Sequence, residues 1–152
     1  MFKQIIVPLD GSPLAEQALD KAFELSKALS APLLLVRVID TASATRLAGV
    51  GTGAGVDFGL ITELLTEEQA EAKEYVEKEV AALKEKGFEV TGTILQGPVA
   101  QAIVETASPD DVIVIASHGR TGVQRWFLGS VAEDVIRHAK SPVMLIRGQA
   151  ES

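Results

Sequence analysis

The residues best suited to bind an anion lie between the apolar run at residues 112–116 and a helical pattern that begins near Gly129. Ser130 and Glu133 form the Ser-x-x-Glu pattern of a capping box, which predicts Ser130 as the N-cap of this helix. The first backbone N–H groups of a helix are unpaired, and its dipole adds about half an elementary positive charge there. A strand, a loop of small residues and a helix start together predict an anion-binding site.

Two glycines and one carboxylate extend this candidate site. Gly119 and Gly129 have no Cβ, so a backbone or a phosphate group can approach them closely. Asp10 follows the first apolar run, and ligands of parallel sheets bind beyond strand ends. Asp10 can instead form the turn before the next helix, for which Ser12 is the predicted N-cap and Pro13 the first residue. Both roles remain open.

Nearby polar residues indicate binding more than catalysis. His118 has no acid or nucleophile paired with it by any motif, so we expect it to shape the loop. Arg120 can reach a phosphate or remain solvated, and Ser130 can both cap its helix and bind phosphate. The sequence has no Gly-x-x-x-x-Gly-Lys-Ser/Thr phosphate loop and no obvious base for activating water. We therefore predict no catalytic residue.

Five apolar runs alternate with amphipathic segments, and these elements must position the candidate site. The predicted strands are residues 4–7, 33–39, 88–95, 112–116 and 143–146. The predicted helices are residues 13–29, 66–86, 99–107 and 130–139, with a Thr66/Gln69 capping box at the start of the second. Residues 41–60, rich in Gly and Ala, are predicted to be a flexible loop. This order predicts an α/β fold, an open parallel sheet with helices on both faces.

The predicted fold is one domain over residues 1–148, followed by a tail at residues 149–152. Ligands of such sheets bind where the strand order reverses. The first strand brings Pro8 and Asp10 to that edge, and the second brings Val38. If the first and fourth strands are neighbours, the crevice between their carboxyl ends is the expected pocket.

Composition limits the classes of partner. The 152 residues are 47% hydrophobic, enough for a packed core, and carry a net charge of -7 without a run of Lys or Arg. This argues against nucleic acid or an anionic membrane surface as a partner. An anionic ligand would need local donors and a metal ion. The chain has no cysteine, no signal-peptide pattern and no apolar run near the roughly 20 residues of a membrane span, so we expect a cytoplasmic protein.

The chain resembles the universal stress protein family over nearly its whole length. The matching segments are residues 6–12, 36–38, 97, 117–122, 129–131 and 141–143. The family's nucleotide signature is Gly-x-x-Gly, nine residues, then Gly and Ser or Thr. Here Gly119 is followed by nine residues and then by Gly129 and Ser130, but Ala116 replaces the first glycine. The added methyl group is expected to reduce clearance for the nucleotide without abolishing its binding.

The resemblance implies a Rossmann-like fold of the adenine nucleotide alpha hydrolase type, with strand order 3-2-1-4-5. It also implies ATP, AMP or ADP between the first and fourth strands, with Mg²⁺ bound through the phosphates. The residues implied near adenine and ribose are Pro8, Asp10 and Val38. Those implied around the phosphates are Gly119, Arg120, Gly129, Ser130 and Val131, while Ser117, His118 and Gly122 shape the loop. Ala116 stands where the family's backbone approaches the ribose and phosphates.

The resemblance further implies a homodimer formed through the last strand, Val143–Ile146, whose apolar edge needs cover. It implies ATP hydrolysis that is slow or absent. We expect a nucleotide-dependent stress-response regulator and not a dedicated enzyme. Two alternatives stay open: a dimeric interaction module that has lost the nucleotide, which Ala116 favours, and a slow ATPase.

Overall fold

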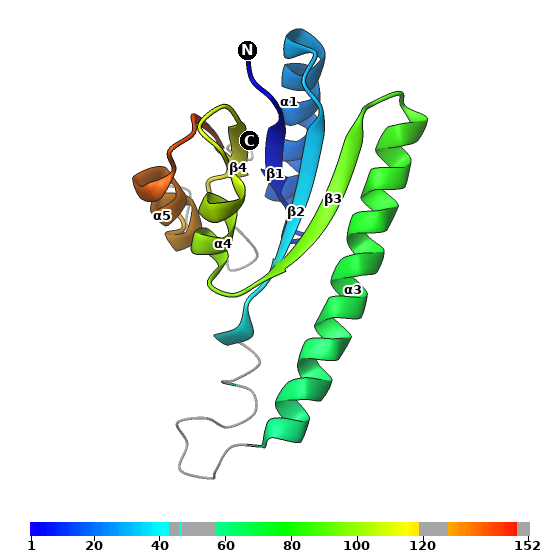
Figure 1. The fold of residues 1–152 in the computed structure, drawn as a ribbon, viewed down its shortest axis with the longest axis vertical. Coiled ribbons are helices and arrows are strands. Elements are labelled where there is room, and N and C mark those ends of the chain that lie inside the picture. The colour runs from blue at the N-terminus through cyan, green and yellow to red at the C-terminus, as the bar shows by residue number, and fades with distance from the viewer. Residues whose placement is uncertain (43–45, 47–56, 119–127, 149–152) are drawn as a thin grey trace.

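The computed structural model describes residues 1–42, 46, 57–118 and 128–148. Strands and helices alternate along these residues (Figure 1). The strands are β1 (Ile5–Pro8), β2 (Leu33–Ile39), β3 (Val90–Gln96), β4 (Val112–Ala116) and β5 (Val143–Ile146). The helices are α1 (Pro13–Leu29), α3 (Phe58–Glu85), α4 (Val99–Thr106) and α5 (Ser130–His138). None of the helices in these residues is both long and apolar enough to cross a membrane.

The five strands form one parallel sheet in the order β3-β2-β1-β4-β5, which confirms the predicted fold class and strand order. Ile5 of β1 is paired with Leu33 of β2 on one side and with Val112 of β4 on the other. The chain first builds outward from β1 to β3 and then crosses to β4. The order therefore reverses between β1 and β4, where a crevice for ligands is expected.

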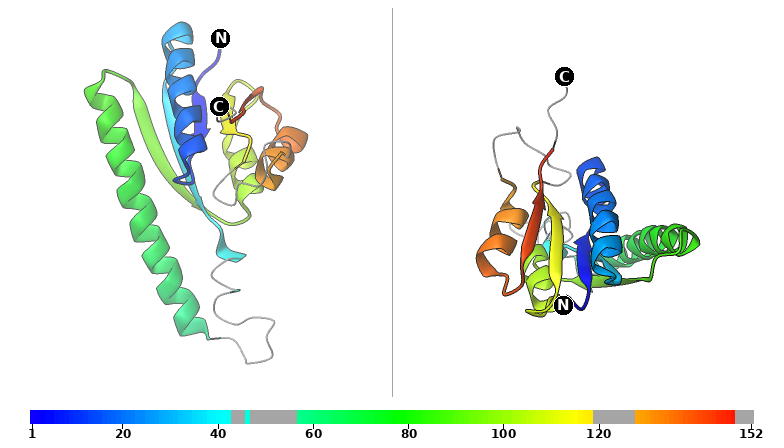
Figure 2. Two further views of the ribbon diagram at one scale, coloured as in Figure 1. Left: turned by 180° about the vertical axis from the view of Figure 1, so that it is seen from behind. Right: turned by 90° about the horizontal axis from the view of Figure 1, so that it is seen from above.

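Helices cover both faces of the sheet, α1 and α3 on one and α4 and α5 on the other (Figure 2). The buried side chains alternate accordingly. Ile5 and Val7 belong to the core beneath α1 and α3, whereas Ile6 packs in the second core with Ile103 of α4 and Val135 of α5. Because β1 is buried on both faces, its residues form a continuous apolar run without polar alternation.

The start of α1 is as predicted, and the start of α3 is not. Ser12 caps α1, its Oγ accepting a hydrogen bond from the Ala15 N–H at 3.2 Å, and Pro13 is the first helical residue. Helix α3 begins at Phe58, so the predicted start at Thr66 is wrong.

Asp57 is the N-cap of α3, since its side chain accepts a hydrogen bond from the Leu60 N–H at 3.0 Å. The Thr66 hydroxyl instead donates to the Thr62 carbonyl at 2.8 Å, an ordinary contact inside a helix. Residues 58–60 are thus helical, although the loop was predicted at 41–60. Residues 43–45 and 47–56 of that loop lie outside the described part of the chain.

Candidate functional site

The carboxyl ends of β1, β2 and β4 bring several of the predicted residues to one edge of the sheet. Pro8 is the last residue of β1, Val38 lies near the end of β2, and Ala116 ends β4. Ser117 and His118 follow directly, and Ser117 remains attached to the sheet because its N–H donates to the Ile146 carbonyl at 2.8 Å. Three other predicted residues lie outside the described residues: Gly119, Arg120 and Gly122.

Asp10 has the turn-forming role that its sequence position allowed. Its Oδ1 accepts a hydrogen bond from the Ser12 N–H at 2.9 Å. A carboxylate has about four lone-pair sites, so this bond does not prevent Asp10 from also accepting hydrogen bonds from a ribose. The two roles are compatible.

Arg37 is a contributor to this edge to which the sequence patterns assigned no role. Its Nη1 donates to the Leu9 carbonyl at 3.3 Å, and Leu9 lies between Pro8 and Asp10. Its guanidinium also lies over the Tyr75 ring, 5.6 Å from the ring centroid. Through these two contacts, Arg37 joins the end of β1 to α3. The only signal in the sequence was that Arg37 is the one charged residue in an otherwise apolar strand.

Helix α5 begins differently from the prediction. Gly129 is the N-cap and Ser130 is the first helical residue, with no side-chain hydrogen bond at the cap, so the predicted capping role of Ser130 is wrong. Glu133, the other half of the predicted capping box, accepts a hydrogen bond from Arg137 Nη2 at 2.7 Å. The Gly129 N–H donates to the Ser117 carbonyl at 2.7 Å, which attaches the start of α5 to the end of β4.

This attachment explains why residue 129 is glycine. A Cβ at Gly129 would lie 3.0 Å from the Ser117 carbonyl oxygen and 3.1 Å from His118 Cα, and both of these are backbone atoms. The close approach sets the first turn of α5, with its unpaired N–H groups, beside the end of β4. His118 follows Ser117 after β4, with its Nδ1 at 3.3 Å from Ser117 Oγ. This tight packing disfavours a side chain at position 129 whether or not a ligand binds.

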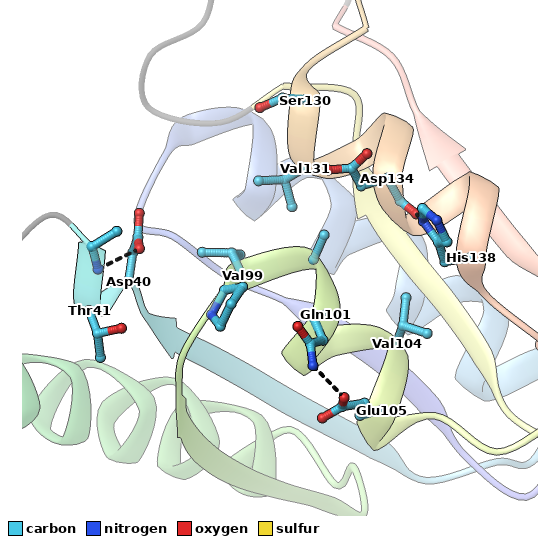
Figure 3. A pocket seen from close by; sticks show the side chains of 13 residues that line it. Asp40, Thr41, Val99, Gln101, Val104, Glu105, Ser130, Val131, Asp134 and His138 are labelled. Atoms are coloured by element: carbon cyan, nitrogen blue, oxygen red, sulfur yellow. Dashed lines mark hydrogen bonds between the residues drawn. The ribbon is translucent and has the colours of Figure 1, made fainter.

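A groove of about 660 Å³ runs between α4 and α5 next to this crevice (Figure 3). Ser130 and Val131 are the predicted site residues that line it. Its lining in the described part of the chain includes the carboxylates of Asp40, Glu105 and Asp134 and no lysine or arginine. The described lining of this α4–α5 groove is thus acidic.

The sequence and the fold were compared with known proteins. A universal stress protein of Methanocaldococcus jannaschii is 36% identical over 149 residues, which are 97% of this chain and 83% of that protein. A universal stress protein of Bacillus subtilis is 30% identical over 97% of this chain and 100% of its own length.

Solved structures give the same result. One, of a hypothetical protein whose biochemical function was assigned from its structure, matches 99% of both chains with a TM-score of 0.83 and 29% identity. Another is a universal stress protein of Archaeoglobus fulgidus in complex with dAMP, which matches 96% of this chain and 98% of that one with a TM-score of 0.64 and 26% identity. The family model for universal stress proteins matches residues 1–147. The chain therefore belongs to the universal stress protein family.

Proposed function

We propose that this protein binds an adenine nucleotide in the crevice between the carboxyl ends of β1 and β4. The observation that carries the proposal is the backbone contact between Gly129 and Ser117, 2.7 Å from N to O, which sets the first turn of α5 beside the end of β4. A helix N-terminus at a strand-order reversal is suited to a phosphate group. The dAMP complex of the Archaeoglobus fulgidus relative supports the same ligand class.

Different residues of the crevice bind different parts of the nucleotide. Pro8, Asp10 and Val38 border adenine and ribose, and Asp10 accepts hydrogen bonds from the ribose hydroxyls. The N–H groups of Ser130 and Val131 and the Ser130 hydroxyl donate to the phosphates. Ala116, Ser117 and His118 form the wall on the β4 side, and Gly119, Arg120, Gly122 and Gly129 complete the set.

ATP with Mg²⁺ is the proposed form of the nucleotide, with AMP or ADP as alternatives. Within the described residues, no three His, Cys, Asp or Glu side chains form a group that could hold a metal. We therefore expect the phosphates to carry the Mg²⁺, which would offset the net charge of -7. The described residues around the crevice suit binding better than hydrolysis, so at most slow ATP hydrolysis is expected.

The proposed biological role is nucleotide-dependent regulation of a stress response in the cytoplasm, by a homodimer joined through β5. The open edge of the sheet supports the dimer, because β5 is the terminal strand and the Met144 side chain is 38% exposed. A dimeric interaction module without nucleotide is the second candidate. It is favoured by Ala116, whose methyl group stands where the family signature has a glycine.

The test is calorimetric titration of the purified protein with dAMP and with Mg-ATP. Ser130→Asp places a carboxylate beside the proposed phosphate site. Two like charges about 4 Å apart repel by roughly 4 kcal/mol at an effective dielectric constant of 20, so we expect affinity to fall by at least tenfold. Ser130→Ala, which removes the hydroxyl without adding charge, should have a smaller effect.

Gln69→Glu is the matched control, because it adds the same charge on an exposed position of α3, on the opposite face of the sheet from α5. Wild-type affinity in Ser130→Asp would place the pocket elsewhere. A folded wild-type protein that binds neither nucleotide would favour the interaction module. Gly129→Asp is a poorer test, since its Cβ would collide with the backbone of Ser117 and disturb the fold itself.

A further inference from the structure

The α4–α5 groove is lined by both apolar and acidic side chains. Val99 and Val104 of α4 and Val131 of α5 supply apolar side chains that line it. Around them stand the carboxylates of Asp40, Glu105 and Asp134, and its described lining contains no basic residue except His138. The groove should therefore attract positive charge and apolar surface together.

The three carboxylates come from different elements and do not converge on one point. Asp40 follows β2, Glu105 lies on α4, and Asp134 lies on α5 (Figure 3). Asp40 lies on one side of the groove, and Glu105 and Asp134 lie on the other, on α4 and α5. The described residues contain no group of three acidic or histidine side chains that could hold a metal ion, whereas a segment with several basic side chains can contact separate carboxylates.

We propose that the α4–α5 groove is a docking site for a basic amphipathic segment of a partner protein. The apolar side chains of such a segment would pack on Val99, Val104 and Val131, and its lysine or arginine side chains would pair with the surrounding carboxylates. A second copy of this chain fits less well, because its net charge of -7 would be repelled by the same carboxylates.

The groove also shares residues with the proposed nucleotide site. Ser130 and Val131 begin α5 and line the groove, and the preceding Gly129 is bonded to Ser117 at the end of β4. If a bound nucleotide restricts the first turn of α5, it changes one end of the groove. The affinity of the groove for the basic segment then changes as well. This linkage rests on the proposed function, whereas the docking site itself does not.

The test is a titration of the full-length, isotope-labelled protein with a synthetic 18-residue amphipathic peptide of leucine and lysine, followed by amide chemical shifts. A peptide of the same pattern with glutamate in place of lysine is the probe control. We expect the leucine–lysine peptide alone to shift the amides of Val99, Val104 and Val131.

The variant is Glu105→Lys with Asp134→Lys, which reverses both helix-borne charges of the groove. The matched control is Asp20→Lys with Glu67→Lys, which makes the same change in net charge at exposed positions of α1 and α3. We expect the groove variant to bind the peptide at least tenfold more weakly, and the control variant to stay within about twofold of the wild type.

Equal weakening in both variants, or shifts centred away from α4 and α5, would show diffuse charge attraction and overturn the docking site. Repeating the titration with saturating dAMP tests the linkage. An unchanged peptide affinity with dAMP bound overturns the linkage alone. Failure of the wild type to bind dAMP overturns the proposed function and leaves the docking result intact.

Discussion

Packing between α3 and β3 predicts whether a methyl group added at Gly92 stabilises or destabilises the protein. A Cβ added at Gly92 would lie 2.3 Å from Val76 Cγ1 and 3.0 Å from Val80 Cγ2. Carbon atoms in favourable contact are about 3.5–4.0 Å apart, so the first contact is too short by roughly 1 Å. Val76 is only 4% exposed and its branched side chain has restricted rotamers, so α3 or β3 must move.

Overpacking of this kind costs about 1–3 kcal/mol, from which about 0.4–1 kcal/mol is recovered because alanine restricts the unfolded chain. We therefore expect Gly92→Ala to lower the free energy of unfolding by about 1–2 kcal/mol. For a chain of this size that corresponds to a fall in Tm of about 2–8 °C, measured by circular dichroism during heating.

The same geometry predicts that Gly92→Ala costs less stability when Val76 is shortened. Val76→Ala removes Cγ1, and the remaining Val76 Cβ would lie at an ordinary 3.8 Å from the new methyl group. Val80 Cγ2 would still lie at 3.0 Å, so in the Val76→Ala background Gly92→Ala should destabilise the protein clearly less than it does in the wild type. Gly148→Ala is the matched control, since its nearest atom would lie at 3.5 Å and Tm should hold. A Gly92→Ala protein as stable as the wild type with Val76 intact would refute this reasoning.

Three further predictions concern α1 and the chain's single tyrosine. Ser12→Ala removes the hydroxyl that accepts the Ala15 N–H, so the free energy of unfolding in denaturant should fall by about 1 kcal/mol; no change would deny Ser12 its capping role. Burial, with Glu79 and Glu16 nearby, raises the pKa of Tyr75, so its absorbance should titrate above the usual value of about 10. The folded state holds the Tyr75 proton more tightly than the unfolded state does. The resulting stabilisation of the fold is complete below pH about 10 and is lost as the pH rises through the raised pKa. Tyr75→Phe should be neutral or stabilising, because the buried hydroxyl has no hydrogen-bond partner in the described residues; a loss above about 1 kcal/mol would mean that it has one.

The strands were predictable because their residues form short apolar runs, which are continuous where a strand is buried on both faces. β2, β4 and β5 have the predicted bounds, since each is an apolar run that ends at proline or turn residues. The ends of β3 differ by one or two residues, because Phe88 and Glu89 precede the strand as an apolar and a polar residue without a turn signal. The strand order came from the family resemblance, and the pairings confirm it.

Helix starts were less predictable, because the same short pattern can occur at a cap or inside a helix. Ser12 is a cap, but Thr66 lies within α3, where its hydroxyl donates to Thr62. Asp57, nine residues earlier, caps the helix instead. Local sequence does not distinguish a pattern at a helix start from the same pattern inside a helix. A capping pattern supplies side chains that can form the hydrogen bonds, but whether they form depends on the conformation of the neighbouring backbone.

The sequence alone determined the α/β class, the apolar strands and the polar residues that follow them, because hydrophobic period and turn chemistry are local properties. Tertiary structure decided the rest. It packs Gly129 closely against the backbone of Ser117, where a side chain is disfavoured. It also brings Arg37 within hydrogen-bonding distance of the Leu9 carbonyl. It also formed the α4–α5 groove from Asp40, Glu105 and Asp134, which are far apart in the chain. Contacts between distant segments arise only when the sheet order is set, so no local pattern could reveal them.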